Sequence, residues 1–79
     1  MGEKRDAGMT SLKRIRKLKG MSQKELSVCS EVSLRMICLY EQRQRDINRA
    51  AAITLYRIAK VPACSMEDLL ELEEDVHGT

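Results

Sequence analysis

Residues 22–41 read SQKELSVCSEVSLRMICLYE and contain two short amphipathic helical patterns separated by three residues. Ser22 is a typical helix N-cap, and Glu25 three positions later completes a capping-box pair. Ser33 begins the second pattern in the same way, without the Glu. Four apolar side chains occupy positions where two steeply crossing helices share a small core: Leu26, Val32, Ile37 and Tyr40. This is the layout of a helix-turn-helix, and it predicts an all-α domain.

The sequence before and within this pair gives the first three helices. The first is expected from about Thr10 to Lys19, and it ends at Gly20, a residue that favours helix C-termini. The second and third are expected at about 22–29 and 33–42. The short spacing between them leaves room only for a tight turn.

Two further helices are expected after a polar loop. One covers about 49–60, with Asn48 as its cap and Pro62 as its breaker. Ser65 is expected to cap the other, whose first turn carries acids that suit the positive end of the helix dipole. The inward residues of the 49–60 helix are expected to be Ile53, Tyr56 or Leu55, and Ile58.

The chain as a whole resembles the lambda-repressor-like helix-turn-helix regulators, also called the XRE family. The resemblance runs from about residue 12 to 70 and rests on LKRIRKLKGMSQKEL, VSLRMICLYE, and ITLYRIAK followed by CSMEDLLE. It implies a compact five-helix domain in which Arg16 forms an ion pair with Glu41. It also implies a DNA-binding transcriptional regulator, a repressor or antitoxin-like autoregulator, that binds palindromic operators as a homodimer.

Four positions depart from the family pattern. Glu31 and Arg43 stand where the family commonly has Gly, because the backbone there tends to be left-handed. Pro62 and Ala63 replace a usual Leu-Gly helix ending. A non-Gly residue in a left-handed conformation costs on the order of 1 kcal/mol, so these changes affect stability more than the fold.

The expected DNA interface follows from the way a recognition helix lies in the major groove. Arg35 is the best candidate for sequence readout, because its two donors match the O6 and N7 acceptors of guanine. The expected base-contacting residues are Leu34, Arg35, Cys38 and Leu39. The expected phosphate-contacting residues are Ser22, Gln23, Lys24, Ser33, Arg43 and Arg45, with Gln23 assigned through the family resemblance.

The charge distribution supports an anionic partner. Residues 1–60 carry all fourteen Lys and Arg against six acids, a net charge of +8, whereas residues 61–79 carry six acids and no Lys or Arg. A basic body with an acidic tail is expected of an anion-binding domain, although charge alone is equally compatible with a solvated helix face. Together with the helix-turn-helix pattern, it favours nucleic acid. Residues 1–9 are charged and show no helical pattern, and the residues past about 73 are expected to be frayed. We therefore divide the chain into a flexible N-terminal arm at 1–9, a helix-turn-helix domain at 10–73 and an acidic tail at 74–79.

The recognition helix is unusually apolar, which leaves a second interpretation open. Leu34 and Leu39 are expected on its outer face, where they could pack on a thymine methyl or against another protein. The alternative function is a protein-interaction module that uses this apolar face. For a second copy of the chain, Leu72 and Val76 are the apolar residues left over, because Leu69 or Leu70 is needed in the core.

Other functional classes find little support in the sequence. The single His77 has no fixed partner, and no nucleotide loop or metal cluster is recognisable, so we expect neither an enzyme nor a cofactor. No apolar run approaches the roughly 20 residues needed to span a membrane, which favours a cytoplasmic protein. The three cysteines match no common zinc pattern and are expected to be reduced, packed thiols: Cys29, Cys38 and Cys64.

Overall fold

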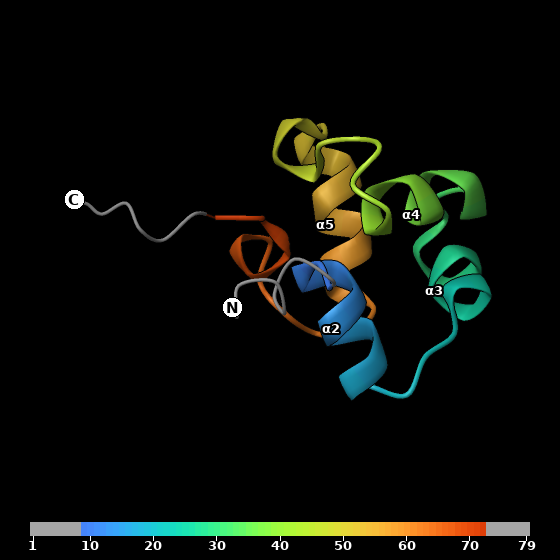
Figure 1. Ribbon diagram of the computed structural model, residues 1–79. Helices are drawn as coiled ribbons and strands as arrows, with labels where there is room; N and C mark the ends of the chain where they lie inside the picture. Colours follow the sequence, from blue (N-terminus) through green and yellow to red (C-terminus); the bar gives the residue numbers. More distant parts are fainter. Residues whose placement is uncertain (1–8, 73–79) are drawn as a thin grey trace, which may run out of the picture.

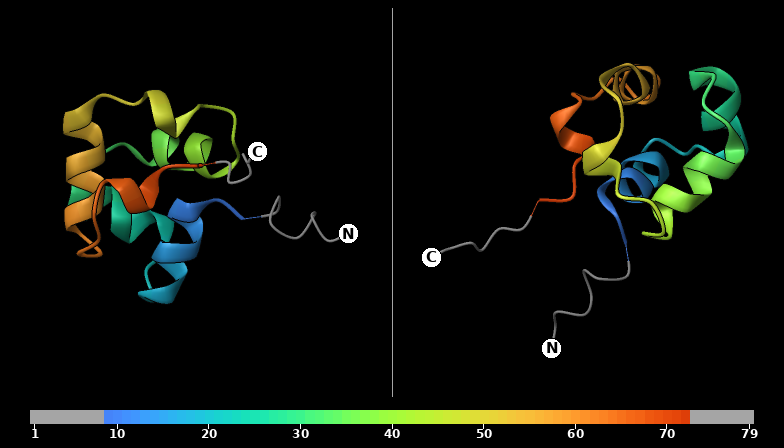
Figure 2. Two further views of the ribbon diagram at one scale, coloured as in Figure 1. Left: turned by 90° about the vertical axis from the view of Figure 1, so that its left-hand side faces the viewer. Right: turned by 90° about the horizontal axis from the view of Figure 1, so that it is seen from above.

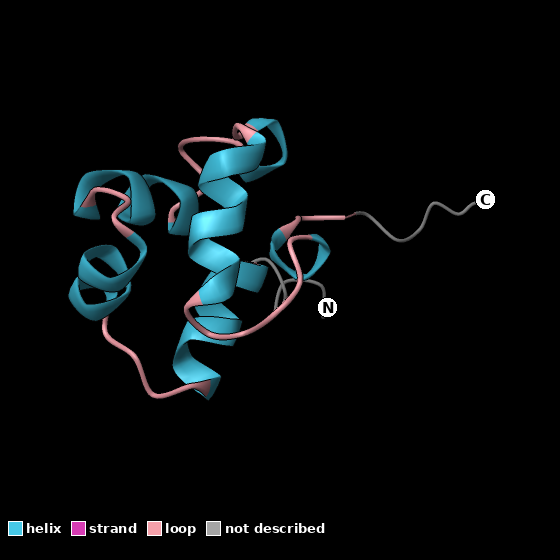
Figure 3. Cartoon of the chain, turned by 180° about the vertical axis from the view of Figure 1, so that it is seen from behind, coloured by secondary structure: helices cyan, strands magenta, loops and turns pink. Residues whose placement is uncertain are grey.

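The computed structural model describes residues 9–72, and within these residues the chain is all helical, without strands. The elements in chain order are α2 (Ser11–Leu18), α3 (Gln23–Ser30), α4 (Leu34–Glu41), the 3-10 turn η1 (Ile47–Arg49), α5 (Ala52–Lys60) and the 3-10 turn η2 (Glu67–Leu69). Figure 1 shows α5 at the centre, with α3 and α4 on one side and η2 on the other. The same arrangement is seen from behind in Figure 3. The expected all-α class is confirmed, with four α-helices in the described part.

The first three helices begin where their capping residues predict. The Thr10 hydroxyl accepts a hydrogen bond from the amide of Lys13 at 3.1 Å. Ser22 and Glu25 form the complete capping box, with the two reciprocal bonds at 3.0 and 2.8 Å. The Ser33 hydroxyl accepts from the Met36 amide at 3.1 Å. These bonds satisfy amides that have no partner within their own helix, which fixes where each helix begins.

The core is aliphatic except for one tyrosine. The four positions predicted to be shared by the helix pair are all buried, with exposed fractions between 0% for Ile37 and 8% for Val32. Leu69 of η2 is fully buried, and η2 packs against both α2 and α5. The buried apolar residues are Leu12, Leu26, Val32, Ile37, Tyr40, Ile47, Leu55, Ile58, Ala59 and Leu69.

The fourth helix differs from the prediction in its start and its inward face. It begins at Ala52 rather than near residue 49, because Asn48 lies inside η1 and its side chain bonds the backbone of Glu71. Asp46 caps η1 instead, accepting from the Asn48 amide at 3.0 Å. Ile53 and Tyr56 are half exposed; the buried apolar residues of α5 are Leu55, Ile58 and Ala59. Leu55 and Ile58 therefore face the core as predicted, whereas Ile53 and Tyr56 do not.

The predicted fifth helix is reduced to the single turn η2. Ser65 does act as a cap, since its hydroxyl accepts from the Asp68 amide at 3.1 Å and its amide donates to the Asp68 carboxylate at 3.0 Å. The turn ends at Leu70, whose backbone is extended with ψ of 151°. Residue Glu71 then pairs with Asn48, and this pairing needs an extended chain. The part of the predicted helix beyond Leu72 lies outside the described residues.

Three of the four positions that depart from the family pattern adopt the left-handed conformation. Glu31, Arg43 and Ala63 have φ of 63°, 60° and 60°, respectively. Glu31 directly follows α3, Arg43 is the second residue after α4, and Ala63 stands in the turn after α5. Each carries the Cβ penalty that Gly avoids, so the backbone retains strain at three turns.

The Ala63 turn gives a direct test of this strain. Ala63→Gly is expected to raise the free energy of unfolding by about 0.5–1 kcal/mol, because relief of the left-handed penalty exceeds the entropy that Gly adds to the unfolded chain. In a domain of this size the midpoint of thermal unfolding should rise by several degrees. Ala51→Gly is the control: Ala51 has φ of −62°, where Gly brings no relief, and this variant should lose stability.

Candidate nucleic-acid interface

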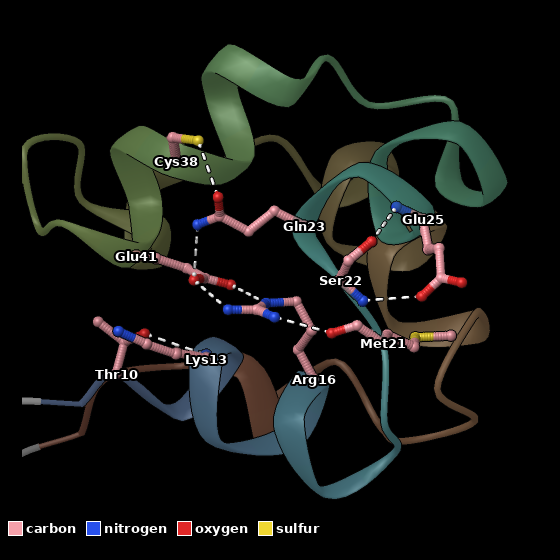
Figure 4. A network of polar contacts seen from close by, with 9 residues as sticks. All are labelled: Thr10, Lys13, Arg16, Met21, Ser22, Gln23, Glu25, Cys38 and Glu41. Atoms are coloured by element: carbon pink, nitrogen blue, oxygen red, sulfur yellow. Dashed lines mark hydrogen bonds and ion pairs between the residues drawn. The ribbon is translucent and has the colours of Figure 1, made fainter.

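A buried ion pair joins α2 to the end of α4. Nε of Arg16 donates to Oε2 of Glu41 at 2.7 Å, and Nη2 donates to Oε1 at 3.0 Å (Figure 4). The Arg16 side chain is 9% exposed and that of Glu41 is 2% exposed. The pair is therefore bidentate and almost dry, and the pairing expected from the family resemblance is confirmed.

Further hydrogen bonds bring α3 into the same network. Nη1 of Arg16 donates to the carbonyl of Met21 at 2.7 Å, just before α3 begins. Nε2 of Gln23 donates to Oε1 of Glu41 at 3.0 Å, and the Cys38 thiol donates to Oε1 of Gln23 at 3.3 Å (Figure 4). The carboxylate of Glu41 thus accepts three hydrogen bonds from two helices. We call Arg16, Gln23, Cys38 and Glu41 the Glu41 network.

The Glu41 network fixes geometry more than it adds stability. The hydrogen bond and the negative charge of Glu41 raise the pKa of the Arg16 guanidinium against the opposing effect of burial, so Arg16 is always charged. Removing two ions from water costs several kcal/mol, and the pairing of such ions about balances that cost. In the described part of the chain, every buried side-chain nitrogen and oxygen has a hydrogen-bond partner. The network therefore allows one relative placement of α2, α3 and α4.

Of the four residues expected to contact bases, two are exposed on the outer face of α4 and two are half-buried. Leu34 is 42% exposed, and Arg35 is also exposed, at the first turn of the helix. Leu39 and Cys38 are half-buried. Cys38 lies toward α3, because its thiol is hydrogen-bonded to Gln23. The accessible part of the predicted reading surface is therefore the N-terminal turn of α4.

The residues expected to contact phosphate divide into three kinds. Lys24 and Arg45 are exposed cations. Ser22 and Ser33 are exposed, but their hydroxyls already cap α3 and α4, so the helix N-termini offer backbone amides to an anion. Gln23 uses its amide oxygen and one N–H within the Glu41 network, and a phosphate contact would need its second N–H.

Arg43 has a partner that the sequence did not reveal. Nη2 of Arg43 lies 3.1 Å from Oε1 of Glu71, and it also approaches the Met9 carbonyl at 3.4 Å. This ion pair borders a cleft of about 230 Å³ at the C-terminal end of α4. The cleft is lined by Tyr40, Arg43, Arg45, Asp46, Ile47 and Glu71. The cleft is therefore lined by two positively charged and two negatively charged side chains.

The thiols are placed differently from the prediction in one case. Cys29 is exposed on α3 instead of packed, because the second helix buries Leu26 and Ser30 and turns Cys29 outward. Cys38 and Cys64 are half-buried. Burial and the neighbouring Asp68 carboxylate raise the pKa of the Cys64 thiol, which keeps it protonated.

Residues 9–72 also lack two other kinds of feature. Those residues contain no group of three or more His, Cys, Asp or Glu side chains able to hold a metal ion. They also contain no helix of the length and apolar character needed to cross a bilayer.

Comparison with known proteins gave no match: no family model, curated protein or solved structure is significantly similar to the chain.

Proposed function

We propose that the protein is a sequence-specific DNA-binding regulator that reads the major groove with α4. The observation that carries this proposal is the Glu41 network, which locks α3 behind α4 while the first turn of α4 remains exposed. A helix held rigidly by a bracing helix can present its N-terminal side chains to base edges without reordering on binding. The resemblance of the residue pattern to lambda-repressor-like regulators, described from the sequence above, is in line with this proposal.

Arg35 is the residue that we assign to base readout. It stands in the first turn of α4 and is exposed. A guanidinium at this position can donate two hydrogen bonds to O6 and N7 of guanine, which is worth roughly 1–3 kcal/mol of discrimination. Leu34 beside it is available for a thymine methyl group. Readout by one Arg and one aliphatic side chain would give a short and partly degenerate half-site.

Backbone contacts are assigned to the cations that surround α4. Lys24, near the start of α3, and Arg45, after α4, are both exposed. In the sequence, Lys24 precedes the proposed reading surface and Arg45 follows it. Arg49 in η1 is also exposed, with Asp46 at 3.9 Å. The net charge of +8 over residues 1–60 supplies the long-range attraction to phosphate. These contacts would orient the domain without selecting a sequence.

We further propose that the protein acts as a homodimer on palindromic sites. The side chain of Leu72 is 71% exposed, whereas Leu69 is buried in the core. Leu72 is therefore an apolar residue available to a second copy, while Val76 lies outside the described residues. Two copies related by a two-fold axis would place two α4 helices in successive major grooves, about 34–36 Å apart.

A selection of binding sites from a random duplex library at moderate salt tests the proposal. Enrichment of an inverted repeat is the expected result, and its half-site spacing would give the dimer geometry. Retention that depends on salt but not on sequence would leave only a basic surface. Absence of retention at low salt would overturn DNA binding and direct attention to a protein partner on Leu34.

Arg35→Ala separates base readout from backbone attraction. We expect this variant to lose about 1–3 kcal/mol of discrimination at one position of each half-site, as measured by competition between the selected site and single-base variants of it. Lys24→Ala is the matched control, since it removes one exposed positive charge from α3. It should weaken all duplexes equally and reduce the salt slope by about 0.9. Unchanged preference in Arg35→Ala would contradict the assignment of Arg35.

A further inference from the structure

The last described residues of the chain are fastened to the region that follows α4. The Glu71 amide donates to Oδ1 of Asn48 at 2.8 Å, and Nδ2 of Asn48 donates to the Glu71 carbonyl at 3.0 Å. Oε2 of the Glu71 side chain accepts from the Ser11 amide, and Oε1 accepts from Nη2 of Arg43 at 3.1 Å. Figure 2 shows the start of α2 and the chain after η2 running side by side. We call Ser11, Arg43, Asn48 and Glu71 the Glu71 clasp.

The clasp holds a carboxylate at a position where DNA phosphate is expected. Arg43 stands two residues after the end of α4, and its side chain is 42% exposed. The Glu71 side chain is 27% exposed, so the ion pair is in contact with solvent. The pair also borders the 230 Å³ cleft that Arg45 lines. A phosphate can reach the Arg43 guanidinium from the solvent side, but it must compete with the Glu71 carboxylate.

We propose that the Glu71 clasp is an intramolecular competitor of DNA phosphate for Arg43, an inference that rests on the proposed function. In the unbound protein Glu71 is an ion-pair partner of Arg43. On a duplex, Arg43 exchanges this partner for phosphate. The exchange is feasible because a solvent-exposed ion pair contributes little stability, whereas a phosphate contact also releases condensed counterions.

The two parts of the clasp have separate roles in this exchange. Asn48 holds the backbone of residue 71 through two uncharged hydrogen bonds, so the carboxylate remains near Arg43 at any salt concentration. The Arg43–Glu71 ion pair is the part that salt screens. The protein therefore carries its own fixed counter-charge, and the clasp lowers affinity for every duplex without changing sequence preference.

Glu71→Gln in the full chain tests the competition. This change keeps the side-chain shape and a carbonyl oxygen for the Ser11 amide, but it removes the negative charge beside Arg43. We expect binding to a short mixed-sequence duplex to tighten about three- to fivefold at low salt. The slope of log affinity against log salt should steepen by about 0.9, the value for one added phosphate contact.

Glu67→Gln is the matched control, because it removes the same charge from an exposed acid in η2. Its effect on affinity should be less than about twofold. In an Arg43→Gln background, Glu71→Gln should have no larger effect than Glu67→Gln. The competitor role would be overturned if Glu71→Gln and Glu67→Gln changed duplex affinity equally in the protein that retains Arg43. It would also be overturned if the effect of Glu71→Gln on affinity persisted in the Arg43→Gln background. Neither result would count against DNA binding itself.

Asn48→Ala provides a second test that does not alter net charge. It releases the backbone of Glu71 and is expected to tighten binding in the same direction as Glu71→Gln. Urea unfolding of each variant establishes that it is folded under the binding conditions. Unchanged affinity in a folded Asn48→Ala variant would overturn the role of the clasp. Failure of the wild-type protein to bind any duplex at low salt would instead overturn the proposed function, and the clasp proposal with it.

Discussion

Glu41→Gln is expected to lower the free energy of unfolding by about 3–5 kcal/mol, measured by urea denaturation. The reason is that Arg16 would remain buried and charged without its counter-ion. The Gln amide could accept one hydrogen bond from Arg16, but its NH₂ group would face the donors of Arg16 and Gln23. Because a domain of this size has about 3–10 kcal/mol of stability in total, much of the population would unfold at room temperature.

Two companion variants show whether burial is the cause. Glu31→Gln removes the same charge from an exposed residue and should change stability by no more than about 0.5 kcal/mol. Arg16→Met combined with Glu41→Leu removes both ions and should recover much of the loss, since it leaves no buried charge unpaired. A Glu41→Gln protein as stable as the Glu31→Gln protein would contradict the conclusion that Arg16 and Glu41 form a buried, charged ion pair.

Leu69→Ala is expected to cost about 2–5 kcal/mol, because it removes a fully buried side chain from the contact of η2 with α2 and α5. The effect should appear as a lower denaturation midpoint with cooperative unfolding retained. It would establish that the C-terminal turn is part of the single core, although it contains only three residues.

Leu72→Ala is the control for this truncation, since Leu72 is 71% exposed. At low protein concentration it should alter stability by less than about 0.5 kcal/mol. A Leu69→Ala variant that behaves like Leu72→Ala would mean that η2 separates from the core in solution. In that case the fold would consist of the elements from α2 to α5 alone.

The parts of the fold that could be predicted are those with short-range signals. The caps at Ser22 and Ser33 depend on bonds between residues three apart, and the first three helices match their expected bounds within about one residue. The start of α5 and the shortened C-terminal turn could not be predicted in this way. Both depend on Asn48 bonding Glu71, a contact across 23 residues that has no local pattern.

The candidate site was predictable to a similar extent. The Arg16–Glu41 pair was expected from the family resemblance, and Leu34 and Arg35 are accessible as the helical pattern predicts. Cys38 was placed outward by helical phase, but its thiol can also bond Gln23 from the side of the helix. The partner of Arg43 was missed because charge counting treats a cation as available unless an acid lies nearby in the sequence. Long-range side-chain pairing is the information that the sequence pattern lacks.

The hydrogen bond between the Ser11 amide and the Glu71 side chain places the beginning of the helical domain next to its end. A module with adjacent ends can be inserted into a surface loop of a host protein, because the host chain needs only a narrow gap to accommodate it. It also means that partners fused directly at Ser11 and Glu71 would start from the same side of the domain.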